Sequence, residues 1–300
     1  MRKQIRTIIA GSCALMLFAA FALCGCSQNP ETPQSNQEEA QSSSKKVQVQ
    51  VLEPEGLSGA MQKIQQAYIA DGHSNISFEN EQYKTMDEFN NALSTSIDAG
   101  LVITDSKNSM DAAVEKNYVD QTTRVDMLKD QLVMVASESS NLADVTLDGI
   151  AAGKYTIAAC DETQFVGNCT AQALSTVGAY VPTSSESGKQ GKDISGKGGS
   201  YKTSAIKDGK VALEASAESV CELVKGGSVD VGFVYASDAE RASGVKVVGT
   251  TGASTHKNIV YPGALVKECK SKQETQDFLN WCLSNKKAKE IWEECGFEVA

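Results

Sequence analysis

The sequence predicts an α/β fold, because short apolar runs alternate with segments whose apolar residues recur at helical spacing. Residues Val47 to Leu52 have the composition of a strand. The segment after them places five apolar residues on one helical face: Leu57, Ala60, Met61, Ile64 and Tyr68. Repeated alternation of this kind favours a mostly parallel sheet that is covered by helices on both faces.

The same alternation continues to the C-terminal end of the sequence. Further strands are predicted at 75–80, 100–104, 130–137, 155–160, 229–237, 245–250 and 257–267. Further helices are predicted at 86–97, 109–119, 169–177 and 216–227, with a closing pair over 273–297. One segment, 184–210, is rich in Gly, Ser and Lys, and its composition indicates a flexible surface loop.

The first residues have the pattern of an export signal. Arg2, Lys3 and Arg6 precede an apolar run that ends in the letters LCGC. This ending resembles a bacterial lipobox, so a lipoprotein signal peptide is expected over 1–25, with Cys26 as the lipidated residue. Residues 26–46 have no aliphatic side chain larger than that of alanine, which predicts a disordered tether between the lipid and the folded part.

Composition and motifs exclude several function classes. The chain has 38 acidic and 28 basic residues and a net charge of −10, so nucleic acid is not an expected partner. The sequence contains no C-x-x-C, G-x-S-x-G or H-E-x-x-H motif. We therefore expect no enzymatic activity, no cofactor and no metal ligands.

Six cysteines lie in the part of the chain that is expected to fold: Cys160, Cys169, Cys221, Cys269, Cys282 and Cys295. An even number in an exported chain suggests disulfides. A bridge between Cys160 and Cys169 and one bridge within the C-terminal three are the local candidates, and the pairing stays open.

Several stretches resemble the molybdate-binding proteins of ABC transporters. Residues 118–137, YVDQTTRVDMLKDQLVMVAS, resemble the family pattern G-x-I-x-x-x-T-R-V-x-x-L-x-N-x-L-V-L-V-A. Residues 224–239, VKGGSVDVGFVYASDA, resemble its V-x-x-G-x-A-D-x-G-I-V-Y-x-S-D-A. The resemblance extends from about Val47 to Phe297.

The resemblance implies a two-lobed type 2 periplasmic-binding-protein fold with a central cleft. Lobe 1 would comprise 47–129 and 258–300, and lobe 2 would comprise 130–257. The chain would cross between the lobes near 130–136 and near 258–264. A ligand would lie in the cleft, and the lobes would close around it by a hinge motion.

The resemblance also implies a set of ligand-binding residues. Family members hold a tetrahedral oxyanion with backbone N–H groups and a few hydroxyls. Carried onto this sequence, these contacts fall on Gly56, Ser58, Lys84, Thr85, Gly167, Ala217 and Tyr235. Gly56 stands where the family has a serine, so its N–H remains but the hydroxyl is lost, and Ser58 is the nearest replacement.

The first turn of this expected site also carries Glu53 and Glu55, which would repel an anion. Either these carboxylates point away from the cleft or the ligand is not molybdate. The sequence thus predicts a monomeric, lipid-anchored extracytoplasmic solute-binding protein that delivers molybdate or tungstate to an ABC permease and its ATPase. The alternatives are another small anionic or organic solute in the same cleft, or a surface interaction protein with no transport ligand.

Overall fold

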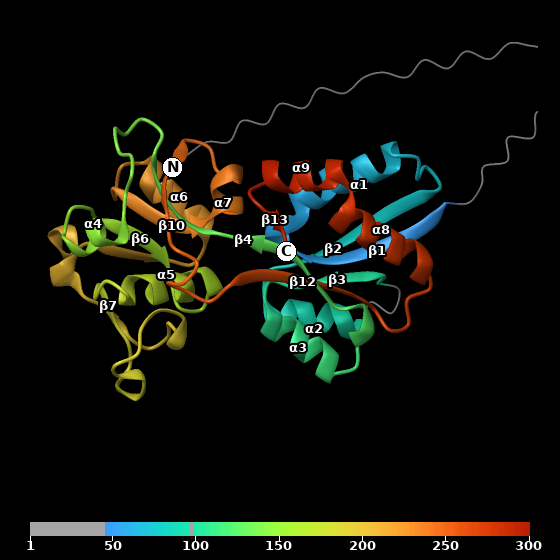
Figure 1. Cartoon of the computed structure of the whole chain (residues 1–300), viewed down its shortest axis with the longest axis horizontal. Coiled ribbons are helices and arrows are strands. Elements are labelled where there is room, and N and C mark those ends of the chain that lie inside the picture. The colour runs from blue at the N-terminus through green and yellow to red at the C-terminus, as the bar shows by residue number, and fades with distance from the viewer. Residues whose placement is uncertain (1–45, 96–98) are drawn as a thin grey trace, which may run out of the picture. The chain divides into compact units, whose positions relative to one another are not determined.

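The computed structural model describes residues 46–95 and 99–300 (Figure 1). The expected signal peptide, Cys26 and all of the tether except Lys46 lie outside these residues. Residues Ser44–Ala300 form one compact unit, which contains every described helix and strand. Within the described ranges, no helix is long and apolar enough to cross a membrane.

Two large sheets, each flanked by helices, form the two lobes, and the fold class expected from the sequence is confirmed. We call the part around the six-stranded sheet lobe 1 and the part around the five-stranded sheet lobe 2. Figure 1 shows the two sheets on opposite sides, with β4 and β12 running towards the boundary between them.

The sheet of lobe 1 has the strand order β13-β4-β12-β3-β1-β2 among the described residues. Its strands are β1 (Val47–Pro54), β2 (Ile76–Tyr83), β3 (Leu101–Ile103), β4 (Val125–Asp130), β12 (Ile259–Leu265) and β13 (Glu298–Val299). Its helices are α1 (Ser58–Ala70), α2 (Met86–Thr95), α3 (Lys107–Glu115), α8 (Lys272–Ser284) and α9 (Lys286–Glu294). β1 pairs in parallel with β2 and β3, whereas β12 runs antiparallel to β3 and β4.

The sheet of lobe 2 has the strand order β11-β5-β10-β6-β9. Its strands are β5 (Leu132–Ser137), β6 (Ile157–Cys160), β9 (Val211–Glu214), β10 (Val231–Tyr235) and β11 (Val245–Thr250). Its helices are α4 (Leu147–Ala151), α5 (Phe165–Ser175), α6 (Ala217–Lys225) and α7 (Ala236–Arg241). β7 (Tyr180–Val181) and β8 (Ser200–Tyr201) form a separate two-stranded ribbon.

The chain passes between the lobes at two described places. Gln131 alone separates β4 in lobe 1 from β5 in lobe 2. Residues 251–258 lead back from β11 to β12. Because both connections are short, the ends of β4, β5, β11 and β12 are held close to the boundary between the lobes, where a cleft can form.

β1 divides the core of lobe 1, because successive side chains of a strand point to opposite faces. Val49 and Val51 belong to the cluster that includes Met61 of α1, whereas Leu52 belongs to the cluster under α2 and α3. Glu53 follows in register with Val49 and Val51, so its carboxyl group is directed to the side of the sheet that α1 covers.

Residues 184–210, which the sequence predicts as a flexible loop, contain short 3-10 helices and β8 and contact α5 at defined points. The Gln172 side-chain amide donates to the Ile194 carbonyl over 2.8 Å. The backbone N–H of Gly191 donates to the Ser175 hydroxyl over 2.8 Å, and both Gly191 and Ile194 are buried. These contacts join the segment to the rest of lobe 2.

The six cysteines of the folded part are all free thiols in the structure. The local disulfides that the sequence allowed, between Cys160 and Cys169 and within the C-terminal three, are not formed. Four of the six side chains are buried, and Cys269 and Cys295 are partly exposed. In this structure the cysteines therefore contribute packing rather than covalent links.

Gly167 and Gly59 provide a matched test of helix packing. A Cβ atom on Gly167 would lie 2.1 Å from the Asp161 carbonyl oxygen, whereas a Cβ on Gly59 would meet nothing within 4 Å. We predict that Gly167→Ala lowers the free energy of unfolding by roughly 1–3 kcal/mol. Gly59→Ala should raise it by roughly 0.5–1 kcal/mol, because alanine loses less backbone entropy than glycine in a helix. Urea unfolding of both variants tests this, and equal stabilities would contradict the packing.

Candidate functional site

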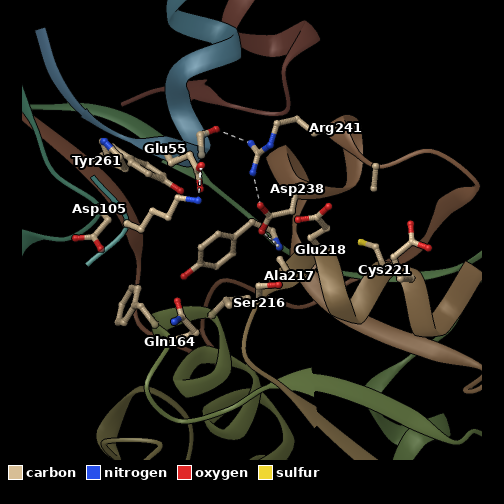
Figure 2. Close-up of a pocket in the computed structure, with 18 of the residues that line it drawn as sticks. Glu55, Asp105, Gln164, Ser216, Ala217, Glu218, Cys221, Asp238, Arg241 and Tyr261 are labelled. Carbon is tan, nitrogen blue, oxygen red and sulfur yellow. Dashed lines mark hydrogen bonds and ion pairs between the residues drawn. The ribbon is translucent and has the colours of Figure 1, made fainter. Parts of the chain in front are cut away.

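A cavity of about 630 Å³ lies between the two lobes (Figure 2). Lobe 1 contributes side chains from the ends of β1, β2 and β3 and from β12: Pro54, Glu55, Gly56, Lys84, Asp105 and Tyr261. Lobe 2 contributes the start of α5, the first turns of α6, and α7 with its flanks: Gln164, Phe165, Val166, Ser216, Ala217, Glu218, Cys221, Glu222, Tyr235, Asp238, Arg241, Ala242 and Ser243. The cavity is therefore built where strands end and helices begin, as ligand sites in open α/β sheets are.

Two helix N-termini of lobe 2 face this cavity. The first N–H groups of a helix have no partner within the helix and carry a partial positive charge. Phe165 and Val166 begin α5, and no side chain caps this helix. At the start of α6, the Ser216 hydroxyl accepts from the Ser219 N–H over 3.2 Å. This cap does not use the N–H of Ala217, the first residue of the helix. This wall of the cavity thus presents neutral hydrogen-bond donors.

Tyr235 ends β10 on the same wall. Its hydroxyl oxygen is buried, no oxygen or nitrogen of the described residues forms a hydrogen bond with it, and the Cys169 thiol is its side-chain neighbour. Burial raises the pKa of Tyr235 well above its usual value, so the hydroxyl keeps its proton and can donate it. A buried hydroxyl without a partner costs free energy, and a ligand in the cavity would supply the missing acceptor.

The lobe 1 wall is different, because the backbone donor of the turn at Lys84 is used within the chain, whereas the turn Glu55–Leu57 has no side-chain cap. The Lys84 N–H donates to a Glu88 carboxylate oxygen over 2.7 Å, and the Thr85 hydroxyl accepts from the Glu88 N–H over 3.2 Å. The Lys84 ammonium forms an ion pair with Glu55 at 2.8 Å, and this hydrogen bond raises the pKa of Lys84. This turn therefore stabilises the start of α2 and holds a carboxylate at the cavity.

Asp105 is a second carboxylate on the lobe 1 wall, two residues after the end of β3. It accepts from the Ser109 hydroxyl over 2.8 Å, and its own N–H donates to the Tyr83 hydroxyl over 3.3 Å. No cation pairs with it among the described residues. Figure 2 shows Asp105 and Tyr261 on one side of the cavity and Asp238, Glu218 and Cys221 on the other.

Arg241 of α7 connects the two walls directly. One guanidinium nitrogen donates to the Gly56 carbonyl of lobe 1 over 2.6 Å, and another pairs with Asp238 of lobe 2 (Figure 2). Asp238 also accepts from the Tyr235 N–H over 3.2 Å. A single side chain thus links the first turn of lobe 1 to the strand end that carries the unpartnered tyrosine.

Four of the seven predicted ligand-binding residues line the cavity: Gly56, Lys84, Ala217 and Tyr235. Ser58 lies within the start of α1, where its N–H donates to the Glu55 carbonyl. Thr85 caps α2 instead. Gly167 is buried in α5 and lines a second cavity of about 460 Å³ on the far side of that helix start, while Phe165 and Val166 face the cleft.

Several further lining residues were not expected from the sequence, among them Asp105, Gln164, Val166, Ser216, Glu218, Asp238, Arg241 and Tyr261. Asp105 and Ser216 could have been suspected, because each directly follows a predicted strand or opens a predicted helix. Arg241 carried no such signal, since only the packing of α7 against the boundary brings it to Gly56.

The two glutamates of the first turn, Glu53 and Glu55, lie in different environments. Glu55 faces the cavity and is held by Lys84. Glu53 does not line it: the side chain is 0% exposed, and neither carboxyl oxygen has a partner among the described residues. Burial raises the pKa of Glu53 to about 8, so this carboxyl group is protonated and uncharged at neutral pH.

The chemistry of the remaining titratable groups argues against a metal centre or a thiol nucleophile in the described part of the chain. No group of three or more His, Cys, Asp or Glu side chains there is placed to hold a metal ion. Burial raises the pKa of Cys221, the thiol at the cavity, to about 11, so it stays protonated.

Comparison with known proteins identifies the family. The model of the family described as bacterial extracellular solute-binding protein matches residues 49–298. The chain belongs to this family. It is 24% identical over 297 residues to a putative ABC transporter substrate-binding lipoprotein, YvgL of Bacillus subtilis, with 99% of each chain covered.

Two further similarities concern molybdate-binding members. The chain is 30% identical over 203 residues to the molybdate-binding protein ModA of Escherichia coli, covering 67% of this chain and 70% of ModA. Its fold is similar to the substrate-binding domain of a putative molybdenum ABC transporter from Clostridium difficile, with a TM-score of 0.69 and 21% identity over 84% of this chain and 99% of that one. The resemblance inferred from sequence motifs is thereby confirmed, and this solute-binding protein has the type 2 periplasmic-binding-protein fold.

Glu53 gives this binding protein a testable pH dependence. The pKa of Glu53 is about 8 in the folded protein and about 4.3 in an unfolded chain. The folded state therefore binds more protons between these values, and the free energy of unfolding falls as pH rises from 5 to 8. Asp130, whose pKa burial raises to about 7, acts in the same direction.

The free energy of unfolding decreases between pH 5 and pH 8, and we predict that this decrease is smaller in Glu53→Gln by on the order of 3 kcal/mol. One pKa unit corresponds to about 1.4 kcal/mol. Part of the pH dependence remains in this variant, because Asp130 is still present. Urea unfolding at pH 5, 6, 7 and 8 measures it, with the exposed Glu115→Gln as control. Parallel pH profiles for the wild type and Glu53→Gln would show that Glu53 is not a buried neutral acid.

Proposed function

We propose that the protein captures a solute by its oxyanion group in the cavity between the lobes. The observation that supports this best is the buried Tyr235 hydroxyl, which has no partner among the described residues and lies on the wall that the N-termini of α5 and α6 also form. Preoriented neutral donors stabilise a desolvated anion, because they neutralise its charge without a buried counter-charge of their own. Ala217, Val166 and Tyr235 are the donors that this proposal assigns.

Molybdate and tungstate are the first ligands to test. Both are tetrahedral dianions, and two of the similar proteins have molybdate or molybdenum in their names. On the lobe 1 side, the N–H of Lys84 donates to Glu88 and is not available to a ligand. The lobe 2 wall therefore carries most of the proposed oxyanion contact.

The proposed cellular role is import. Solute-binding proteins of ABC transporters deliver their ligand to a membrane permease that an ATPase drives. We propose that lipidation at Cys26 and a tether over 26–46 hold the domain at the outer face of the cell membrane. The name of the Bacillus subtilis relative, a lipoprotein, supports this arrangement.

The similar proteins are named as binding or transport proteins, which supports a role without catalysis.

An organic solute that carries the same oxyanion group is the second candidate. The cavity of about 630 Å³ lies within the range of roughly 300–1,000 Å³ that pockets for organic ligands occupy. A surface interaction protein without a transport ligand is disfavoured, because such a protein has no need of two helix N-termini and a tyrosine that line one cavity.

Thermal unfolding of the protein from Ser44 onward, with and without oxyanions, tests the proposal. The probes are molybdate, tungstate, sulfate, phosphate and the organic anion ethylphosphonate. A probe at 100 times its dissociation constant adds about 2.7 kcal/mol to the free energy of unfolding. We expect an increase in melting temperature with at least one probe at millimolar concentration. No increase with any of them would contradict the assignment of an oxyanion site.

Tyr235→Phe tests the hydroxyl that the proposal depends on. Loss of this donor should weaken binding of the best probe by about 1–2 kcal/mol, or roughly 5- to 30-fold in the dissociation constant, because a hydrogen bond to a charged group is lost. Isothermal titration calorimetry measures it. Tyr155→Phe, in lobe 2 but away from the cavity, is the matched control. Unchanged affinity in Tyr235→Phe would remove this residue from the site.

A further inference from the structure

We propose that the solute is a zwitterion: an oxyanion group bound by lobe 2, joined through a short organic arm to an ammonium group bound by Asp105 and Glu55 of lobe 1. This inference rests on the proposed oxyanion site and names the class of its ligand. It follows from how donors, acceptors, charges and space are divided within the cavity.

The two walls of the cavity differ in the groups that they offer a ligand. Lobe 2 presents the uncapped start of α5, the N–H of Ala217 and the buried hydroxyl of Tyr235, all of which are donors. Lobe 2 also carries three lining carboxylates, of which Glu222 is paired with Lys225 and Asp238 with Arg241. Lobe 1 presents the carboxylates of Glu55 and Asp105. A ligand that satisfies both walls needs acceptors at one end and charged donors at the other.

The carbonyl and N–H groups of lobe 1 add to this asymmetry. The Gly56 carbonyl already accepts from Arg241 over 2.6 Å. The Lys84 N–H already donates to Glu88. The backbone donors that lobe 1 keeps are those of the turn Glu55–Leu57, which has no side-chain cap and carries the Glu55 carboxylate.

The charges of the lining residues point in the same direction. Five carboxylates line the cavity: Glu55, Asp105, Glu218, Glu222 and Asp238. The lining cations are Lys84 and Arg241, and both are paired with lining carboxylates, Glu55 and Asp238 respectively. A bare dianion would enter a field with excess negative charge, whereas an ammonium group on the same ligand offsets that repulsion.

Lys84 shows by its own position that a primary ammonium group fits against Glu55 inside the cavity, at 2.8 Å. Its side chain is 66% exposed and has a flexible stem, so it can move when a ligand enters. Asp105 has no cation of its own among the described residues, and its one side-chain partner is the Ser109 hydroxyl. Asp105 is therefore the first contact for the ligand ammonium, and Glu55 is the second.

The unpartnered hydroxyl of Tyr235 is an observation independent of the acidic residues, and it fixes where the anionic end goes. Figure 2 shows Asp105 across the cavity from Ala217, whose N–H begins α6. A ligand whose two charged groups contact Asp105 and the start of α6 must be longer than a single tetrahedral ion. The cavity volume of about 630 Å³ leaves room for such a ligand. An arm of two or three carbons is the simplest that joins them.

Calorimetric titration with matched pairs of ligands tests this inference. The pairs are 2-aminoethylphosphonate with ethylphosphonate and 3-aminopropylphosphonate with propylphosphonate, beside molybdate as an inorganic probe. Within a pair the oxyanion group and the chain length are constant, and the terminal ammonium group is the main difference. We expect at least one amino ligand to bind 10-fold or more tightly than its partner and than molybdate.

Two variants identify the residues responsible. Asp105→Asn and Glu55→Gln should each reduce the preference for the amino ligand at least 3-fold, while binding of the ligand without the amine stays constant or strengthens. Asp111→Asn, which removes a carboxylate of the same lobe that pairs with Arg124 away from the cavity, should keep the wild-type preference. Circular dichroism spectra confirm that each variant is folded.

The outcomes separate this inference from the proposed function. If molybdate or the simple phosphonates bind as tightly as the amino ligands, the zwitterion inference is wrong and the oxyanion site stands. If the amino ligands are preferred but Asp105→Asn and Glu55→Gln leave the preference unchanged, the assignment to lobe 1 is wrong. If none of the probes binds, both the oxyanion site and the inference that rests on it fail.

Discussion

An anion enclosed between two protein lobes must be held by groups that can replace its water of hydration, and this requirement governs the whole site. Full counter-charges are costly to bury, whereas the N–H groups at the start of a helix are already oriented and partly positive. The N-termini of α5 and α6 meet this requirement from lobe 2, together with the buried hydroxyl of Tyr235. The positions of these helices follow from the sheet, because each begins where a strand of lobe 2 ends.

The first turn of lobe 1 shows how a sequence can place acidic residues beside such a site without cancelling it. Glu53 is buried on the α1 face of β1 as a neutral acid. Glu55 reaches the cavity but is paired with Lys84. Glu53 therefore affects stability rather than binding. Glu55, together with Asp105, gives the lobe 1 wall carboxylates that can bind a cationic group. Arg241 connects this wall to Asp238 and through it to Tyr235.

Much of the fold could be predicted from the sequence, because the periodicity of apolar residues follows the burial of strands and helices. The strand that ends at Tyr235 and the helix after Ser216 were both expected, and both carry residues of the cavity. Motif matching placed Gly56, Ala217 and Tyr235 at the cavity for the same reason: each stands at the end of a strand or the start of a helix. Asp105 stands in an equivalent position after β3, so the same rule could have found it.

The rest of the site could not be read from the chain, because it depends on side-chain contacts between distant segments. The Lys84 N–H donates to Glu88, so this backbone group is not available to a ligand. Arg241 meets Gly56 across 185 residues of sequence. The direction of Glu53 depended on strand register, and its protonation on burial under α1. Gly167, in the first turn of α5, lines the second cavity and not the cleft between the lobes.

The most direct test of the central claim is the position of tungsten in crystals grown with tungstate, located by its anomalous scattering. We predict one main anomalous peak in the cavity on the lobe 2 side. The tungstate oxygens should lie within hydrogen-bonding distance of the Tyr235 hydroxyl and of the first N–H groups of α5 or α6. A main peak beside Lys84 on the lobe 1 wall, or one outside the cavity, would contradict it.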